Sequence, residues 1–367
     1  MPRPPHILIA GGGTGGHVYP AIAIADAIRA QAPEARVVFA GTQDRLEARA
    51  VPDAGYALHP ITVSGFQRGW SMKNLTFPVK LMKGLVQSWR LVGTLNPDVA
   101  VGTGGYVAGP VLLAAWMQGR PLLVQEQNAY AGVTNRLLAL VAARIHLAFE
   151  EAKEWVPADR ATVSGNPTRA ALQTTTRADA RAALGLPDDA RVLLVVGGSL
   201  GSKALNDAME QHHDTLLSDE TVHVIWQTGS RYDDAIHERV DSHPRLHVQA
   251  YIDRMDHAYA AADLALCRAG ALTCSELMVT GTPAVLVPSP NVVADHQTKN
   301  ARSMEAQGAA RVLPEAELET RLAEVVRTLL TDAAARGAMA DAARTMARPD
   351  AAETIADDAL ALARSYR

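Results

Sequence analysis

Short apolar runs that are typical of buried strands alternate with helical stretches along most of the chain. The first series lies between residues 6 and 167 and comprises "HILIA", "ARVVFAG", "PDVAVGTG", "PLLVQE", "RIHLAF" and "ATVSGNP". The second lies between residues 191 and 314 and comprises "RVLLVV", "VHVIWQTG", "LHVQAYI", "ADLALCRAG", "PAVLVPS" and "AARVLP". Such alternation favours parallel sheets whose strands are joined by right-handed crossovers.

The strand pattern changes near residue 166, where a helical connector separates the two series. Each series opens with a strand, a glycine-rich turn and a helix. The pattern therefore predicts an α/β fold of two similar doubly wound domains that face each other across a cleft. We expect the N-terminal domain at 1–165 and the C-terminal domain at 166–345, with a last helix at about 346–367 that packs back on the first domain.

The composition is that of an ordinary globular protein, and 367 residues suit two domains. The 35 Lys and Arg against 39 Asp and Glu give a net charge of −4, so no global nucleic-acid surface is expected. Two cysteines, Cys267 and Cys274, are too few for a disulfide framework, and "MPRPPHILIA" has no signal-peptide pattern, which predicts a reducing cytosol. No run approaches the roughly 18 apolar residues of a spanning helix, so any membrane contact is expected to be peripheral.

The first glycine turn, "GGGTGGH", ends at His17 and precedes a helix predicted from Pro20 onward. Glycine permits positive φ and close approach of a ligand, and the first N–H groups of the helix face that ligand, which predicts an anion site for phosphate. The dinucleotide fingerprint also requires an acidic residue at the end of the second strand, which this chain lacks. A Walker loop requires Lys after the last glycine, where the chain has His17. Two interpretations stay open: a nucleotide or acceptor loop with His17 at its mouth, or a His17 that only packs the helix start.

Three further glycine turns follow strands. The turn at 101–110 is either a second ligand loop or a tight turn with Tyr106 in the core. The turn at 195–206 carries Ser199, which suits a diphosphate at a helix start. In the turn at 268–277, Glu276 is either a solvated residue or an acceptor for both hydroxyls of a ribose. Since open parallel sheets bind ligands at the carboxyl ends of their strands, we expect all four turns at one cleft.

Seven motifs occur in the order seen in the bacterial peptidoglycan N-acetylglucosaminyltransferases: "GGTGGHVYPA", "GTGGYVAGP", "QEQNAYAGVTN", "SGNPTR", "GGSLGSKALN", "RAGALTCSE" and "DHQTKNA". The chain resembles this MurG family over roughly residues 7–301. The resemblance implies a GT-B fold of two Rossmann-like domains. It also implies an inverting transfer of GlcNAc from UDP-GlcNAc to the C4 hydroxyl of muramoyl-pentapeptide on undecaprenyl pyrophosphate. This reaction converts lipid I to lipid II on the cytoplasmic face of the inner membrane, with no cofactor.

The resemblance also implies which residues bind UDP-GlcNAc. Arg169 and Ser199 would hold the diphosphate, Glu276 the ribose hydroxyls and Gln297 the GlcNAc ring, while Ile252 would meet uracil through its backbone. The complete donor set is Thr14, Gly15, Gly16, Asn128, Arg169, Ser199, Ile252, Ala271, Leu272, Thr273, Cys274, Ser275, Glu276 and Gln297.

On the acceptor side, the resemblance implies a loop of Gly104, Gly105 and Tyr106. His17 is the best-placed general base, because the ordinary pKa of histidine, about 6.5, suits proton removal near neutral pH. No metal site is expected, since the two cysteines are seven residues apart without a second pair nearby.

Residues 68–90 mix basic with aromatic and aliphatic side chains, which suits an anionic membrane surface. An amphipathic crossover helix with its apolar face in the core explains the same pattern, and both interpretations stay open. The residues concerned are Arg68, Trp70, Lys73, Phe77, Lys80, Leu81, Lys83, Leu85, Trp89 and Arg90.

Three alternative functions remain at this point. Two are enzymes: another GT-B transferase with a different UDP-sugar, or a UDP-GlcNAc 2-epimerase. The third is a nucleotide-sugar-binding scaffold among other proteins of envelope synthesis. The presence of His17, Arg169, Ser199 and Glu276 favours an enzyme over a silent scaffold.

Overall fold

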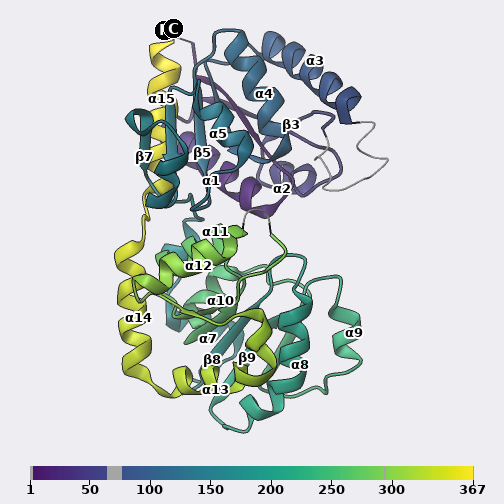
Figure 1. Ribbon diagram of the computed structural model, residues 1–367, viewed down its shortest axis with the longest axis vertical. Helices are drawn as coiled ribbons and strands as arrows, with labels where there is room; N and C mark the ends of the chain where they lie inside the picture. Colours follow the sequence, from purple (N-terminus) through teal and green to yellow (C-terminus); the bar gives the residue numbers. More distant parts are fainter. Residues whose placement is uncertain (1–2, 64–76, 293–294, 367) are drawn as a thin grey trace. The chain divides into compact units, whose positions relative to one another are not determined.

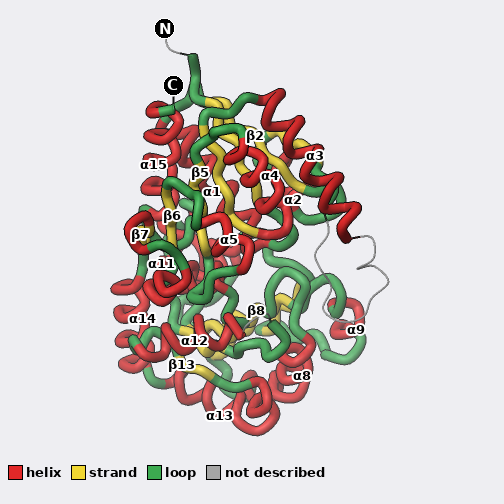
Figure 2. The backbone as a smooth tube through the Cα atoms, turned by 45° about the horizontal axis from the view of Figure 1, so that its top comes forward, coloured by secondary structure: helices red, strands yellow, loops and turns green. Residues whose placement is uncertain are grey.

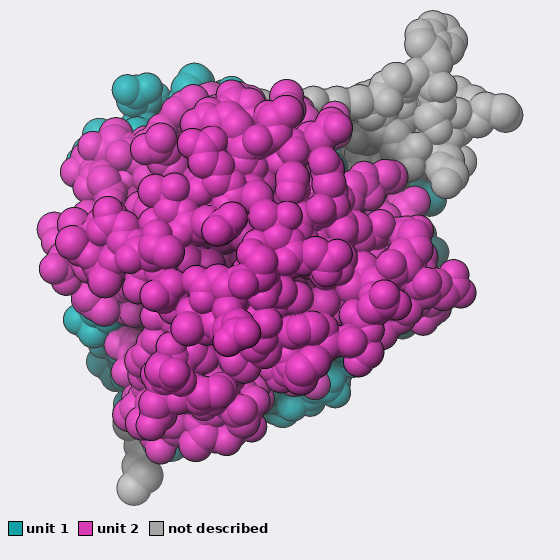
Figure 3. Space-filling model, turned by 90° about the horizontal axis from the view of Figure 1, so that it is seen from below, with its two compact units in different colours: residues 1–168, 349–367 teal, residues 169–348 magenta. Residues whose placement is uncertain are grey.

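The computed structural model describes residues 3–63, 77–292 and 295–366 (Figure 1). The chain forms two compact units, each with its own parallel sheet. Unit 1 comprises Met1–Thr168 and Pro349–Arg367, and unit 2 comprises Arg169–Arg348 (Figure 3).

The sheet of unit 1 has seven strands in the order β3-β2-β1-β4-β5-β6-β7, and all neighbours are parallel. The strand order reverses at β1, which has β2 on one side and β4 on the other. Ligands of doubly wound sheets bind at such a reversal, outside the carboxyl ends of the strands. The strands are β1 (His6–Gly11), β2 (Arg36–Gly41), β3 (Ala57–Pro60), β4 (Val99–Gly104), β5 (Leu122–Glu126), β6 (Arg144–Leu147) and β7 (Ala161–Val163).

Helices cover both faces of this sheet (Figure 2). Ile7 and Ile9 of β1 pack into the cluster that contains α1 and α15, whereas Leu8 and Ala10 pack into the cluster on the opposite face. This is the two-residue alternation of a strand that is buried on both faces. The helices are α1 (Gly15–Gln31), α2 (Glu47–Asp53), α3 (Phe77–Leu95), α4 (Gly105–Met117), α5 (Val133–Ala139) and α15 (Ala351–Ser365), with 3-10 helices η2 (Glu150–Trp155) and η3 (Ala158–Arg160).

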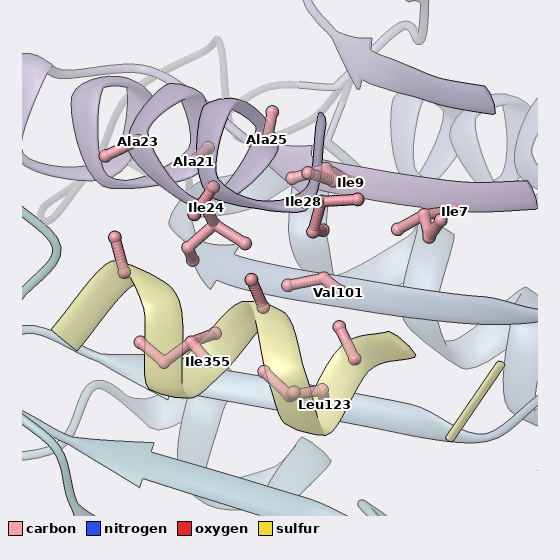
Figure 4. Packing of buried hydrophobic residues seen from close by; sticks show 14 of the residues in the cluster. Ile7, Ile9, Ala21, Ala23, Ile24, Ala25, Ile28, Val101, Leu123 and Ile355 are labelled. Atoms are coloured by element: carbon pink, nitrogen blue, oxygen red, sulfur yellow. The ribbon is translucent and has the colours of Figure 1, made fainter. Parts of the chain in front are cut away.

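The last helix, α15, completes the core of unit 1. Ile355 and Leu360 are buried in the same cluster as Ile24 and Ile28 of α1 (Figure 4). Burying one such side chain stabilises a fold by about 1.5–3 kcal/mol. A polar contact supports the helix, because His146 Nε2 of β6 lies 3.1 Å from Asp358 Oδ2.

The sheet of unit 2 has six strands in the order β10-β9-β8-β11-β12-β13, again all parallel. The order reverses at β8, which has β9 on one side and β11 on the other. The strands are β8 (Arg191–Val196), β9 (Val222–Gln227), β10 (Leu246–Gln249), β11 (Leu264–Cys267), β12 (Ala284–Leu286) and β13 (Arg311–Val312).

The largest fully buried side chain, Trp226 of β9, lies in the core of unit 2 together with side chains of α8 and α13. Its indole N–H donates to Asn206 Oδ1 over 3.1 Å, so the buried polar atom is paired. The helices are α6 (Ala171–Thr174), α7 (Arg177–Leu184), α8 (Lys203–Leu217), α9 (Asp233–His237), α10 (Met255–Ala261), α11 (Ala271–Thr280), α12 (His296–Ala306), α13 (Leu318–Thr331) and α14 (Ala333–Met346), with the 3-10 helix η5 (Glu315–Glu317).

The predicted fold class, α/β with two doubly wound Rossmann-like sheets, is confirmed. Two details differ from the sequence prediction. Strand β3 has only four residues at the sheet edge and no apolar alternation, so no pattern indicated it. Helix α1 begins at Gly15, not at Pro20, because Pro20 removes a single hydrogen bond within the helix that the glycine turn has already started. No helix in the described residues has the length and apolar content that spanning a bilayer requires.

Candidate active site

A buried carboxylate fixes the first glycine turn. Gly13, at φ 91°, donates its N–H to Glu47 Oε2 over 2.9 Å. Glu47 Oε1 accepts from the Thr42 N–H at 3.1 Å and from the Thr42 hydroxyl at 2.7 Å. A Cβ on Gly12 would lie 2.4 Å from Glu47 Oε1, so the turn closes around this carboxylate. The sequence did not indicate Glu47, which reads as part of a solvated helix face.

Contacts within unit 1 orient the His17 imidazole. Its Nδ1 lies 2.9 Å from the Thr103 carbonyl oxygen and 3.1 Å from Gln127 Oε1. A carbonyl oxygen only accepts, so the hydrogen-bond pattern assigns the proton of the neutral ring to Nδ1. The lone pair therefore resides on Nε2, which is the atom that can accept a proton.

A network of buried side-chain amides holds Gln127, one of the two hydrogen-bond partners of His17 Nδ1. Gln127 Nε2 donates to the Thr103 carbonyl oxygen and to Gln125 Oε1. Gln125 Nε2 donates to Asn166 Oδ1 over 2.8 Å, and Asn166 Nδ2 donates to the Gln127 carbonyl oxygen over 3.0 Å. The network fixes which end of the Gln127 amide faces His17.

The second glycine turn lies directly against the first. A Cβ on Gly104, at φ 100°, would lie 2.9 Å from His17 Nδ1, and a Cβ on Gly105 would lie 2.3 Å from the Gly12 carbonyl oxygen. Both positions therefore require glycine. Tyr106 is 59% exposed, so the interpretation that placed Tyr106 in the core is wrong.

Glu126 holds the loop that contains Asn128. Its carboxylate is buried and accepts from the Asn128 N–H at 2.9 Å, the Asn128 side-chain amide at 3.2 Å and the Gly132 N–H at 2.9 Å. Asn135 Nδ2 donates to the same carboxylate over 2.8 Å. The sequence pattern predicts no role for Glu126 or Asn135. The signal for Glu126 is its place as a charged residue at the end of the buried strand β5, whereas Asn135 lies in α5 and has no such signal.

The helix starts at these turns differ in how they are capped. Thr14, the N-cap residue of α1, makes no side-chain capping hydrogen bond, and the N-cap residues of α4 and α11 are the glycines Gly104 and Gly270, which have no side chain. In contrast, Ser202 caps α8 by accepting from the Leu205 N–H over 3.4 Å. The first turns of α1, α4 and α11 thus suit an anionic ligand, since helix N-termini carry partial positive charge.

In unit 2, the structure brings Arg169 and Glu276 together. Arg169 Nη2 lies 3.7 Å from Glu276 Oε1, and the Tyr259 hydroxyl donates to Glu276 Oε2 over 3.1 Å. Burial raises the pKa of Glu276, and the nearby Arg169 and Tyr259 oppose this effect. Tyr259, which the sequence did not indicate, is buried, and desolvation raises its pKa well above the usual value.

Gln227 joins the turn of Ser199 to Ile252. Its Nε2 donates to the Gly198 carbonyl oxygen over 2.9 Å, and its Oε1 accepts from the Ile252 N–H over 2.9 Å. Ser199 itself is exposed. Because the Ile252 N–H is already paired, a backbone contact between Ile252 and a nucleobase would use the carbonyl oxygen, which suits a uracil N–H donor.

The residues of α11 that are predicted to contact the donor differ in how far they are buried. Leu272 and Thr273 are half-buried, whereas Ala271, Cys274 and Ser275 are buried. Burial raises the pKa of Cys274 to about 12, so the thiol stays protonated. The Cys274 N–H donates to the Gly270 carbonyl oxygen over 2.9 Å, so this residue closes the first turn of α11.

Gln297 of α12 accepts the Ser289 N–H on Oε1 over 2.9 Å. Asn300, on the same helix, donates to the Ala269 carbonyl oxygen over 3.2 Å, so α12 is attached to the turn before α11. Among the residues that the structure describes, no cluster of three or more His, Cys, Asp or Glu side chains is arranged to hold a metal ion.

Both units match known glycosyltransferase domains. Residues 7–147 match the glycosyltransferase family 28 N-terminal domain, and residues 192–355 match the glycosyltransferase family 28 C-terminal domain. The chain is 68% identical over 365 residues to the "UDP-N-acetylglucosamine--N-acetylmuramyl-(pentapeptide) pyrophosphoryl-undecaprenol N-acetylglucosamine transferase" of Salinibacter ruber. That alignment covers 100% of this chain and 99% of the relative.

Solved structures agree with these matches. The crystal structure of Acinetobacter baumannii MurG is similar with a TM-score of 0.75 and 33% identity, covering 98% of this chain and 100% of the other. A Neisseria meningitidis UDP-GlcNAc 2-epimerase has a TM-score of 0.68 at 14% identity over 97% of this chain and 100% of its own, which is a likeness of fold alone. The resemblance to the MurG family and the GT-B fold class is confirmed. The chain therefore belongs to glycosyltransferase family 28, and within it to the MurG family of bacterial N-acetylglucosamine transferases.

Proposed function

We propose that this protein transfers GlcNAc from UDP-GlcNAc to the C4 hydroxyl of undecaprenyl-pyrophosphoryl-MurNAc-pentapeptide, converting lipid I to lipid II in peptidoglycan synthesis. The observation that carries the proposal is the 68% identity to a transferase of that name over essentially the whole chain. The oriented imidazole of His17 supports the chemistry, because an inverting transfer needs a base for the acceptor proton.

The reaction is a single in-line displacement. The C4 hydroxyl oxygen forms a bond to the anomeric carbon of GlcNAc, while the bond from that carbon to the β-phosphate oxygen of UDP breaks. The hydroxyl proton moves to His17 Nε2, and UDP leaves with the electron pair of the broken bond. Thr103 and Gln127 hold the proton of the neutral ring on Nδ1, so that Nε2 carries the lone pair that accepts the hydroxyl proton.

Unit 2 supplies the donor contacts in this proposal. Arg169 and Ser199 bind the diphosphate, because a guanidinium can donate two parallel hydrogen bonds to phosphate oxygens. Glu276 accepts the ribose hydroxyls, and its pairing with Arg169 joins the ribose contact to the diphosphate contact. Residues 271–276 at the start of α11, Ile252 and Gln297 complete the donor contacts within this unit.

Unit 1 supplies the acceptor side, with Gly104, Gly105 and Tyr106 beside His17. The remaining donor contacts in this proposal are Thr14, Gly15 and Gly16 of the first turn and Asn128. The exposed side chain of Tyr106 next to the two glycines is accessible to a sugar or diphosphate.

In this proposal the enzyme is a peripheral protein of the cytoplasmic face of the inner membrane, and α3 of unit 1 makes the membrane contact. Lys80, Lys83 and Arg90 are exposed beside Met82, which is 60% exposed, and Trp89, which is 47% exposed. An amphipathic helix whose apolar face lies in the core does not explain why Met82 and Trp89 are exposed. Leu81 is also exposed, Leu85 is half-buried, and Arg68, Trp70, Lys73 and the side chain of Phe77 lie outside the described residues.

The function is tested by mass spectrometry of the purified protein with UDP-GlcNAc and a short-chain lipid I analogue. We expect an acceptor heavier by one N-acetylhexosamine with UDP-GlcNAc, and less with UDP-GalNAc. An unmodified acceptor together with isomerised or cleaved UDP-GlcNAc would instead indicate an epimerase. Binding of UDP without any reaction would favour the scaffold.

For His17→Ala we expect kcat to fall by about 10²–10⁴-fold, the usual contribution of a general base, while the Kd for UDP-GlcNAc stays within about twofold. Steady-state kinetics and calorimetry measure the two quantities. His237→Ala, on the exposed helix α9, is the matched control and should leave both unchanged. Turnover near the wild-type rate would remove His17 from the base role.

For Glu276→Ala we expect the Kd for UDP to rise about 10–100-fold, the range for hydrogen bonds to a charged group. Because burial raises the Glu276 pKa, wild-type affinity should weaken as the pH falls toward that pKa, and Glu276→Gln should remove this dependence. Calorimetry with UDP and a 2′-deoxy analogue tests the assignment. An equal loss for both ligands in Glu276→Ala would show that the carboxylate does not contact the 2′-hydroxyl.

Reversing Lys80, Lys83 and Arg90 to Glu should reduce sedimentation with anionic vesicles, because each basic residue contributes about 1 kcal/mol near such a surface. The control reverses Arg311, Arg321 and Arg327 in unit 2, which changes the net charge equally. Equal binding by both triple variants would rule out α3 as the contact.

A further inference from the structure

Arg136 of α5 lies against two aromatic rings in unit 1. Its guanidinium carbon is 5.3 Å from the centroid of the Tyr130 ring and 5.4 Å from that of Trp155. The two rings are themselves in contact, with centroids 4.5 Å apart at an interplanar angle of 59°. A guanidinium over aromatic faces is attracted to them and keeps its N–H edges for another acceptor.

The cluster lies at the same sheet edge as His17. Tyr130 belongs to the loop after β5, which Glu126 fixes through the N–H groups of Asn128 and Gly132 on either side. Trp155 ends η2, which follows the adjacent strand β6. Arg136 directly follows Asn135 in α5. A Cβ on Gly104 would lie 3.5 Å from Asn135 Nδ2 and 2.9 Å from His17 Nδ1, so Asn135 is near the imidazole.

The charge of Arg136 has no anionic partner in the part of the chain that the structure describes: no carboxylate oxygen lies within 4.0 Å of its nitrogens. Arg29 of α1 shows the contrast, since it lies 4.5 Å from the centroid of the Tyr56 ring but also pairs with Asp26 at 3.1 Å. A permanently charged, half-buried guanidinium without such a partner suits an external anion.

We propose that Arg136, Tyr130 and Trp155 form a subsite for a peptide carboxylate of the acceptor. This rests on the proposed function, in which the acceptor carries a pentapeptide. The guanidinium fork binds the carboxylate, and the 38% exposed ring of Trp155 contacts the adjoining apolar side chain of the peptide. A five-residue peptide spans up to about 17 Å, so the subsite can act at a distance from the reacting sugar.

The test compares two acceptors that share the same diphosphate and differ only in the peptide carboxylates, which are either free or converted to primary amides. For the wild-type enzyme we expect an acceptor KM about tenfold lower with free carboxylates. In Arg136→Met this preference should disappear, while kcat and the KM for UDP-GlcNAc stay within about twofold. Arg136→Lys, which keeps the charge without the fork, should retain part of the preference.

Arg29→Met is the matched control, because it removes an arginine from an aromatic ring in the same unit and should keep the full preference. Circular dichroism verifies that each variant is folded. A wild-type enzyme that transfers GlcNAc equally well to both acceptors would overturn the subsite. An Arg136→Met variant whose acceptor KM rises by the same factor for both acceptors would also overturn it, since that result indicates a diphosphate contact or a packing role. Transfer to neither acceptor would refute the proposed function itself.

Discussion

Close contact between backbone segments at the carboxyl edge of each sheet is the constraint on which the candidate site depends. In unit 1, the turns after β1 and β4 approach so closely that a Cβ on Gly105 would lie 2.3 Å from the Gly12 carbonyl oxygen. In unit 2, a Cβ on Gly229 would lie 2.2 Å from the Gly201 nitrogen. Because no side chains fit between these turns, main-chain groups form the surface at this edge of each sheet, where doubly wound sheets bind their ligands. The Thr103 carbonyl oxygen that orients His17 is one such group.

Three buried carboxylates behave differently at these edges. Glu47 and Glu126 accept hydrogen bonds from backbone N–H groups of the loops around them, so their oxygens serve to fix those loops. Within the described residues, the partners of Glu276 are the side chains of Tyr259 and the more distant Arg169, and its pKa is raised. A buried carboxylate that is not saturated by the backbone has remaining capacity for a ligand. This difference separates the structural acids from the proposed binding acid.

The sequence was sufficient to predict the parallel sheets and the glycine turns, because each of these has a local pattern. Glu47 could not be predicted, since its burial depends on Gly13, 34 residues earlier in the chain. Gln227 and Tyr259 could not be predicted for the same reason, because their hydrogen-bond partners lie 17 to 29 residues away in the chain. The donor and acceptor roles of individual residues stay predictions, since no local pattern and no contact within the protein tests them.

The return of α15 to unit 1 has a consequence for biosynthesis. The first 168 residues are translated early, yet Ile24 and Ile28 need Ile355 and Leu360 to complete the core around them. Unit 2, a continuous segment, can close its own core before those residues leave the ribosome. During that interval the part of α1 and of the first sheet that α15 covers remains accessible to water, and apolar surface exposed in this way makes a nascent chain prone to aggregate. The part of the protein that is made first is therefore the part that finishes folding last.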